Sequence, residues 1–416
     1  MNATAKSFIA AGALLASAGA ILVGTRMRDG VDVGGGGPLQ AANVEGLVAS
    51  RDPREVPEGD YFYEISNLLK QRYVEPIKDE QKLALGAVRG MVGSLGDPDS
   101  IYLDASEFKV HSAMRKGRFE GIGAQLELVN RTESPKEAKP SGQPMSAEEI
   151  LATGIRIPRL TVVAVVPGGP AERAGVRTGD WVEFVDDHWV PNAEAVAAFR
   201  ILEQNVRKGK AKMETLIKMR QELRAKTKRT VLPLKARSKL TMGLSGKVKV
   251  VWNREGKQFT TEIVRSACQG LAFSDSDGVI RLPLQSGDDD RLREAISGKD
   301  EVTIDIRQNA LGDPNVMRAC LEVIAPKGTF GAISRSKHDF PLEVKGGNSH
   351  PPKVTLLVDK STRGSAEVFA QVLLAAGIAN VSGGPMAGHS VLIEDVPLPD
   401  GSGYTLAVGE YKVKSK

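Results

Sequence analysis

The sequence predicts a multidomain α+β protein, with an amino-terminal helical unit, a β-rich middle domain that carries a helical insertion, and a carboxyl-terminal α/β domain. The chain has 416 residues, which is too long for one ordinary hydrophobic core. Forty-four glycines and few aromatic residues are typical of a loop-rich protein of this class. Regular alternation of strand-like and helix-like segments is confined to the last third of the chain, which indicates a separate α/β domain there.

An uncharged run of 17 residues, Phe8–Gly24, lies near the amino terminus between Lys6 and Arg26. Its length is at the lower limit for spanning a bilayer, and the small residues 16–18 could form a cleavage site. We therefore expect residues 1–30 to be a removed signal peptide or an uncleaved membrane anchor. We slightly favour the anchor, because apolar residues continue beyond the cleavage site. Both alternatives place the body of the protein in the cell envelope, in the periplasm or at the membrane.

Two helices are predicted after a glycine-rich linker at residues 31–57. Apolar residues recur at helical spacing from Phe62 to Tyr73 and again from Ala84 to Leu95. Pro76 ends the first of these patterns. We assign residues 58–112 to an amino-terminal helical unit whose apolar faces need a neighbour to cover them.

The middle of the chain, residues 113–266, reads as a β domain of short β-branched runs between glycines. Its clearest element is a hairpin over residues 247–265, which turns at Arg254–Lys257 with glycine where a positive φ is needed. Further strands are expected in residues 119–129, 160–166 and 180–187. Two insertions interrupt this domain: a polar loop at residues 131–157 and a basic helical segment at residues 200–242.

The basic helical segment carries the protein's excess positive charge. Residues 201–240 hold thirteen Lys or Arg against three Glu, so they carry +10, whereas the whole chain carries +5. Such a segment could bind nucleic acid or anionic lipid, but it contains no aromatic residue on which bases could stack. Charge runs usually face water, so we expect a solvated helical arm and no nucleic-acid partner.

Strand and helix alternate from residue 267 to residue 416, which predicts an α/β domain with a mostly parallel sheet. Ligands bind such sheets at the carboxyl ends of the strands, where loops lead into helices. The candidate site therefore lies in the loops 307–314 and 359–367. The elements that flank these loops are predicted as buried strands at 302–306 and 354–359, and helices at about 289–297, 316–324 and 365–376.

Cysteine and histidine are scarce in this chain. Cys268 and Cys320 either form a single disulfide or remain free thiols, and we favour buried free thiols because free cysteine packs as a small hydrophobe. The five histidines and two cysteines have no metal-ligand spacing. We therefore expect neither a metal nor a cofactor.

Six segments resemble, in the same order, motifs of the carboxyl-terminal processing, or tail-specific, serine peptidases that carry a PDZ domain. They are SLGDPDSIYLDASEF (94–108), similar to LGDPYSxYL; FEGIGAQL (119–126), similar to FxGIGxxL; VVPGGPAERAGVRTGDWVEFVDD (165–187), similar to SPAxxAGlkxGDxIxxIdg; VTIDIRQNALGDP (302–314), similar to LILDLRxNPGG; VDKSTRGSAEVFA (358–370), in place of VNxxTASASEIxA; and GGPMAGHS (383–390), in place of GExTfGKGS. The resemblance implies a PDZ-like domain at 113–266, a ClpP/crotonase-like peptidase core at 267–416, and protein or peptide C-termini as partners.

The resemblance assigns peptide binding to the loop Gly121, Ile122 and Gly123. Backbone N–H groups of such a loop can bind a carboxylate, while the adjacent strand edge pairs with the peptide. The alternative is a small β domain whose glycines only form a tight turn.

Both catalytic positions of the family hold other residues here. Gly364 stands at the position of the nucleophilic serine, and His389, 25 residues later, stands at that of the lysine base. Ile393 replaces the supporting glutamine, and Gly312 is the one glycine that remains of two in the oxyanion loop. Because glycine offers no nucleophile, the inherited mechanism cannot run as it does in the family.

Three interpretations follow, and we favour the first, a peptide-binding homologue with impaired proteolysis. The second is an active peptidase that uses Ser365 as nucleophile, His389 as base, and Asp395 or Glu394 to orient the base. Ser365 is also a plausible N-terminal cap of the following helix. The third is an envelope protein with a structural role that acts through its basic arm.

The chain ends soon after Tyr411 without the tail that is usual in the family. We therefore also expect an open sheet edge that a second copy could cover, which would give a homo-oligomer.

Overall fold

The computed structural model describes residues 58–129, 158–336 and 338–414. The chain forms two compact units, residues 1–80 and 81–416, and each is considered by itself. The described part of the first unit is the helix α3 (Glu58–Arg72), which confirms the first predicted helix. Its apolar face, which includes Phe62 and Ile65, is exposed. The division at Glu80 falls inside the predicted helical unit 58–112.

The second unit opens with α4 (Glu80–Ser94), β1 (Tyr102–Leu103) and α5 (Ala105–Met114). A capping box starts α5, because Asp104 accepts the N–H of Glu107 and Glu107 accepts the N–H of Asp104. None of the helices in the described ranges is long and apolar enough to span a bilayer. The predicted signal or anchor segment and the linker at 31–57 lie outside those ranges, as does the predicted loop insertion.

The predicted β domain forms a six-stranded antiparallel sheet with the order β3-β4-β5-β7-β8, to which β6 is added beside β5. The strands are β3 (Ala124–Val129), β4 (Arg159–Val165), β5 (Trp181–Val185), β6 (His188–Trp189), β7 (Lys247–Arg254) and β8 (Lys257–Val264), and the short helix α7 (Pro170–Arg173) follows β4. The predicted hairpin is confirmed: β7 and β8 pair in register, and Glu255 and Gly256 turn with φ of 52° and 85°. Two short strands, β2 (Arg118–Phe119) and β9 (Cys268–Gln269), pair where the chain enters and leaves this domain.

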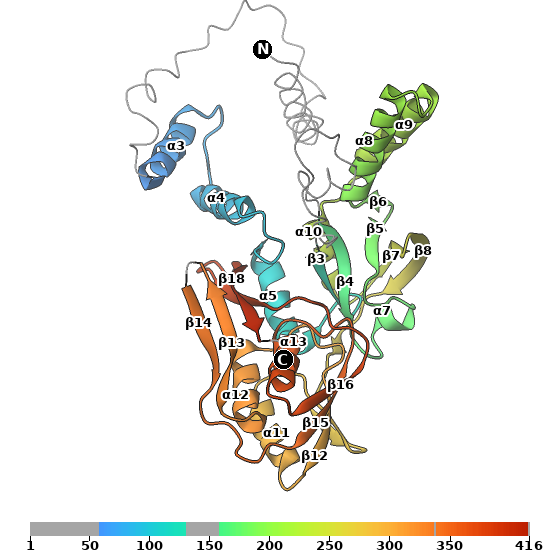
Figure 1. The fold of residues 1–416 in the computed structure, drawn as a ribbon. Helices are drawn as coiled ribbons and strands as arrows, with labels where there is room; N and C mark the ends of the chain where they lie inside the picture. Colours follow the sequence, from blue (N-terminus) through green and yellow to red (C-terminus); the bar gives the residue numbers. More distant parts are fainter. Residues whose placement is uncertain (1–57, 130–157, 337, 415–416) are drawn as a thin grey trace, which may run out of the picture. The chain divides into compact units, whose positions relative to one another are not determined.

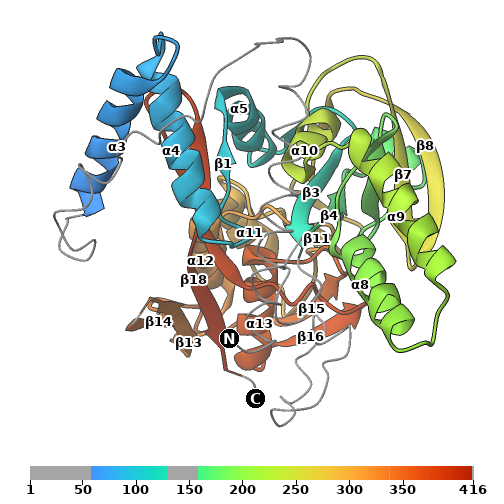
Figure 2. The same cartoon turned by 90° about the horizontal axis from the view of Figure 1, so that it is seen from above.

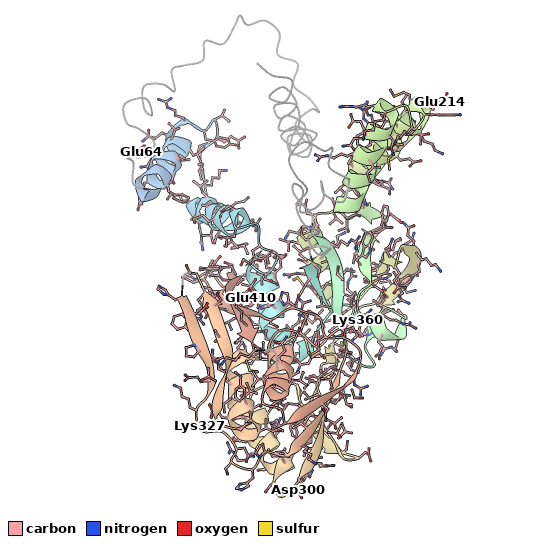
Figure 3. The ribbon with its side chains drawn as sticks, in the orientation of Figure 1. Glu64, Glu214, Asp300, Lys327, Lys360 and Glu410 are labelled. Atoms are coloured by element: carbon pink, nitrogen blue, oxygen red, sulfur yellow. The ribbon has the colours of Figure 1, made fainter. Side chains whose placement is uncertain are left out.

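The basic segment folds as helices, as predicted, but not all of it is an arm. The helices α8 (Ala193–Arg207) and α9 (Met213–Lys228) lie side by side as a hairpin (Figures 1 and 2), and Glu214 lies at its tip (Figure 3). The helix α10 (Pro233–Thr241) instead buries Ala236 and Leu240 completely in the core of the β domain. The predicted insertion boundary at residue 242 is therefore wrong, because the apolar i, i+4 face of α10 packs against the sheet.

The carboxyl-terminal region contains the predicted mostly parallel sheet, with the order β10-β11-β12-β15-β16 and parallel pairing from β11 onward. A second, antiparallel sheet contains β1-β18-β13-β14, and β17 is paired with β18. The elements are β10 (Ser274–Ser276), β11 (Val279–Arg281), α11 (Asp288–Ile296), β12 (Glu301–Asp305), α12 (Pro314–Ile324), β13 (Gly328–Arg335), β14 (His338–Val344), β15 (Lys353–Val358), α13 (Ser365–Ala375), β16 (Ala379–Gly383), β17 (Val391–Pro397) and β18 (Gly403–Val413).

The helices α12 and α13 lie between these two sheets (Figures 1 and 2), and one buried apolar cluster joins all three layers. The last strand, β18, pairs with other strands on both of its sides. The open edge that the sequence predicted is therefore not at this strand.

Both cysteines are free thiols, as we favoured. Cys320 is fully buried on α12, whereas Cys268 is only partly buried, so the expectation of two buried thiols holds for one of them.

Candidate functional site

The two loops that the sequence singled out lie side by side. They follow the neighbouring parallel strands β12 and β15, so both start at the same edge of the sheet. Thr362 Oγ1 donates a hydrogen bond of 3.0 Å to the carbonyl of Ile306, and the Arg363 N–H donates one of 3.1 Å to the carbonyl of Asn309. Lys360 lies in the turn after β15 (Figure 3).

Gly364 occupies the turn between β15 and α13 with φ 56° and ψ −126°. Its N–H donates a hydrogen bond of 2.8 Å to the carbonyl of His389, and its carbonyl accepts the N–H of Val368 at 3.0 Å. A Cβ built on Gly364 would meet no heavy atom within 4 Å. In other hydrolases a strained turn from strand to helix carries the nucleophilic side chain. Here the residue at that turn is a glycine, which has no side chain.

His389 reaches this turn through its backbone, while its side chain turns to a different partner. The Nε2–H of His389 donates a hydrogen bond of 2.9 Å to Oδ2 of Asp99, and both side chains are largely buried. The buried carboxylate of Glu367 accepts the N–H groups of Gly388 and His389 at 3.1 and 2.9 Å. The histidine is thus fixed by one carboxylate at its backbone and by another at its ring.

Ser365 is buried at the first position of α13 and lies against the oxyanion loop, because a Cβ built on Gly312 would be 3.3 Å from the Cβ of Ser365. No hydrogen bond joins Ser365 to His389, both of which the structure describes. The ring nitrogen Nε2 of His389 is already bound to Asp99. The serine–histidine pair of the second interpretation is therefore not assembled.

The two carboxylates predicted to orient His389 contact other residues, so this prediction is wrong. Asp395 accepts a hydrogen bond of 2.9 Å from Nε2 of His111 and lies 3.4 Å from Nε of Arg115. Burial alone would raise the pKa of Asp395, but the hydrogen bond from His111 and the charges of His111 and Arg115 lower it below its usual value. Glu394 lies 3.6 Å from Arg335 on β13. The acid beside His389 is Asp99, from a segment almost 300 residues away in the sequence.

The side chain of Asn309 anchors the loop 309–312 to the neighbouring chain segment. Asn309 is buried, and its amide donates hydrogen bonds of 3.1 and 2.9 Å to the carbonyls of Leu282 and Pro283. Gly312 packs against Leu284 and Ser365. The loop that should form the oxyanion hole is therefore ordered beside the turn of Gly364.

Two residues that the sequence reasoning did not select lie at this site, Asp99 and Arg363. Asp99 stands at the tyrosine of the LGDPYSxYL pattern, so a departure from that pattern was the available signal. Arg363 stands at the alanine before the nucleophile in TASASE, and its buried guanidinium lies 2.8 Å from Oε2 of Glu127 on β3. Ser361, in the same turn, is hydrogen-bonded to Thr178 of the β domain at 2.6 Å. The turn that leads to Gly364 is thus bonded to the β domain at two points.

The predicted peptide-binding loop is engaged within the protein. The Gly121 N–H donates to the carbonyl of Gly243, and the Ile122 N–H donates to that of Leu240, both at 2.9 Å. The Gly123 N–H makes a longer bond of 3.4 Å with the carbonyl of Glu120. The end of α10 therefore occupies two of the amides that were expected to face a ligand carboxylate, and peptide binding at this loop stays a prediction.

A cavity of about 100 Å³ lies beside this loop, between α5, β3, α10 and the loop 309–312. Its lining combines apolar side chains, such as Val110 and Leu126, with the guanidinium of Arg237 and the carboxylates of Asp99, Glu107, Glu127 and Asp395. In the described parts of the chain, no group of three or more His, Cys, Asp or Glu side chains is arranged to hold a metal ion.

Comparison with known proteins gives the family context of this arrangement. Residues 278–416 match the profile of peptidase family S41, and residues 44–107 match that of the activating protease CtpB N-terminal domain. The carboxy-terminal processing protease CtpB of Bacillus subtilis (strain 168) is 23% identical over 422 aligned positions, which cover 98% of this chain and 74% of that protein. The chloroplastic carboxyl-terminal-processing peptidase 2 of Arabidopsis thaliana is 24% identical over 351 positions, which cover 81% of this chain and 58% of that protein.

A solved structure is also similar in fold. The photosystem II D1 C-terminal processing protease superposes with a TM-score of 0.53 at 18% identity, covering 85% of this chain and 82% of that chain. The two profile matches, the relatives and the shared fold agree with the motif order in the sequence. Residues 278–416 therefore form a peptidase family S41 domain, and the chain as a whole is similar to the carboxyl-terminal processing peptidases.

Proposed function

We propose that this protein binds the C-termini of proteins or peptides through its PDZ-like β domain and does not cleave them by the serine–lysine mechanism of its family. The observation that carries this proposal is Gly364. It has the strained backbone of a nucleophile turn, free space where a side chain would be, and no side chain. The scaffold of the site is in place while the reacting group is missing.

The architecture of the β domain supports the binding half of this proposal. Among the strands that the structure describes, β3 pairs only with β4, so it is an edge strand of its sheet in this part of the chain. Extended peptides add to such edges. The relatives are named for processing carboxyl termini, and we extend that preference to this chain as part of the proposal.

The second candidate function is proteolysis through Ser365 and His389. It would need His389 to release Asp99 and turn towards Ser365, because its Nε2 atom is bound to that carboxylate. The third candidate is a structural role of the basic hairpin α8–α9 at an anionic surface. Attachment to the cell envelope stays a prediction from the sequence.

Two measurements on the full chain test the proposal. A serine-directed fluorophosphonate should label neither the wild type nor the variant Ser365→Ala. An array of decapeptides with random sequences and free C-termini should yield binders, and these should lose affinity when their terminal carboxylate is amidated. Labelling that disappears in Ser365→Ala would establish the relocated peptidase instead.

The array also separates the third candidate from the first. A binding partner whose capture depends on the lysines and arginines of α8–α9, and not on the β3 edge, would favour the structural role. If no free-acid decapeptide binds above its amidated form, the peptide-binding function is rejected.

A further inference from the structure

Arg237 is a partly buried cation for which the described part of the chain offers no hydrogen-bond or ion-pair partner. It lies on α10 and lines the cavity between α5, β3 and α10. No hydrogen bond or ion pair joins its guanidinium to any other described residue, although the group offers five donors. Burial lowers the pKa of Arg237, and only the more distant charges of Glu107 and Glu127 oppose that effect. A guanidinium that lines a cavity with its donors unused is suited to bind an anion.

The two nearby carboxylates are not available to pair with Arg237. Glu107 binds the hydroxyl of Ser238, the ammonium of Lys235 at 3.4 Å and the N–H of Asp104 at 3.1 Å. Glu127 binds Arg363 at 2.8 Å and the amide of Gln125. Both anions are therefore satisfied elsewhere, and the guanidinium is left facing the cavity.

The size and lining of the cavity fit the last residue of a peptide. Its volume of about 100 Å³ equals that of roughly three or four water molecules. Apolar side chains contribute much of the cavity wall, among them Val110, Met114, Leu126, Leu128 and Leu311. Four carboxylates also line the cavity, and each has a cationic or histidine partner within the protein: Asp99, Glu107, Glu127 and Asp395. A small apolar side chain and a carboxylate would match both parts of this lining.

The loop of Gly121 is the competing place for a carboxylate, and its geometry is less suitable. The carbonyls of Leu240 and Gly243 already accept the N–H groups of Ile122 and Gly121, so a ligand there would have to break two backbone hydrogen bonds. A carboxylate at Arg237 breaks none. A bidentate pair of a guanidinium with a carboxylate is also among the stronger hydrogen-bonded contacts in proteins.

We propose that the guanidinium of Arg237 is the receptor for the terminal carboxylate of the bound peptide, whose last side chain is a small apolar one in this cavity. The inference rests on the proposed peptide-binding function. The terminal carboxylate is then recognised by a side chain of α10 and not by the backbone amides of the loop 121–123. The residue belongs to a helix that the sequence reasoning had assigned to the solvated basic arm.

The test compares a free acid with its amide on matched variants of the full chain. The probes are N-acetyl-Ala-Val and its carboxamide, together with free-acid and amidated forms of decapeptides that bind in the array. In the wild type, amidation should weaken binding about tenfold or more, as expected for the loss of a charge-assisted pair. In Arg237→Gln the free acid should bind no better than the amide, whereas binding of the amide should be unchanged.

Lys239→Gln is the matched control, because Lys239 is an exposed cation on the same helix whose ion-pair partner is Asp186. It should keep the full preference for the free acid. Arg237→Lys should retain part of that preference, and thermal unfolding of both Arg237 variants should show that they are folded. A preference for the free acid that survives Arg237→Gln would overturn the inference but leave the peptide-binding function intact. The absence of any binding in the wild type would instead reject the function itself.

Discussion

The imidazole of His389 and the carboxylate of Asp99 are hydrogen-bonded at 2.9 Å, and each stands at a position where the family pattern has a different residue. Asp99 replaces a tyrosine and His389 replaces the lysine base. The two departures from the pattern therefore contact each other. A histidine–carboxylate pair therefore lies beside the turn of Gly364.

This pair predicts how the family chemistry can be restored. In the double variant Gly364→Ser with His389→Lys, the carboxylate of Asp99 would hold the introduced lysine in its charged form, which cannot act as a base. Adding Asp99→Tyr should raise the rate of fluorophosphonate labelling about tenfold or more, since a nearby opposite charge shifts a pKa by about 1–3 units. Glu394→Gln, added to the double variant in place of Asp99→Tyr, is the control and should have no effect. Equal labelling of the double and triple variants would contradict the predicted role of Asp99.

Gly364→Ser alone should be tolerated but should lower stability. The positive φ of 56° is unfavourable for a residue with a Cβ, at a cost of about 1–3 kcal/mol, while the open space around the position adds no clash. Urea unfolding measures the difference. Gly175→Ser is the matched control, because Gly175 has a φ of 78° and equally open surroundings. If Gly364→Ser lowers the free energy of unfolding far more than Gly175→Ser does, a side chain does not fit in the turn.

The contact between Arg363 and Glu127 should stabilise the packing of the turn at Gly364 on β3. Removing one partner leaves the other charge partly buried, so Arg363→Ala should lower the free energy of unfolding by about 3 kcal/mol. The exposed pair of Lys353 and Glu301 is the control, and Lys353→Ala should cost less than about 0.5 kcal/mol. In a double-mutant cycle of Arg363→Ala with Glu127→Gln, additive effects would mean that the ion pair contributes nothing.

Acid should destabilise the α/β domain through Asp305 at the end of β12. Burial raises the pKa of Asp305, but hydrogen bonds from Arg307 and the charges of Arg281 and Arg307 outweigh it, so the pKa in the folded state lies below its ordinary value. The stability that Asp305 contributes is therefore complete above about pH 4, the unfolded value, and is lost as the pH falls through the folded value. Asp305→Asn should lower stability near pH 6 and flatten its decline below pH 4. If the stability of Asp305→Asn declines below pH 4 as steeply as that of the wild type, other carboxylates cause the acid sensitivity.

The two thiols should differ in reactivity. Cys320 is fully buried and Cys268 is partly exposed, and burial raises the pKa of both, which disfavours the reactive thiolate. A thiol reagent should react slowly with Cys268 in the folded protein and with Cys320 only after unfolding. Cys268→Ser should remove the reaction of the folded state, and detection of a disulfide between the two residues would contradict the free thiols.

Residue patterns predicted most of the architecture that positions the site. The alternation of buried strands and amphipathic helices in the last third placed loops 307–314 and 359–367 at one edge of a parallel sheet, and the hydrogen bond from the Arg363 N–H to the Asn309 carbonyl confirms that they meet. The prediction succeeded because hydrophobic periodicity is local and adjacent parallel strands have a common edge. The extent of the basic arm was predicted wrongly. The many charges in residues 201–240 outweighed Ala236 and Leu240, the two apolar residues that pack α10 into the core.

The sequence by itself determined the order of the elements and the missing hydroxyl at Gly364, because both depend on which residues follow one another. Only the tertiary structure decided that His389 faces Asp99, that Arg363 reaches β3, and that Arg237 finds no partner among the residues described. These are side-chain pairings between segments far apart in the chain. Their partners are chosen by packing geometry, which no local pattern records.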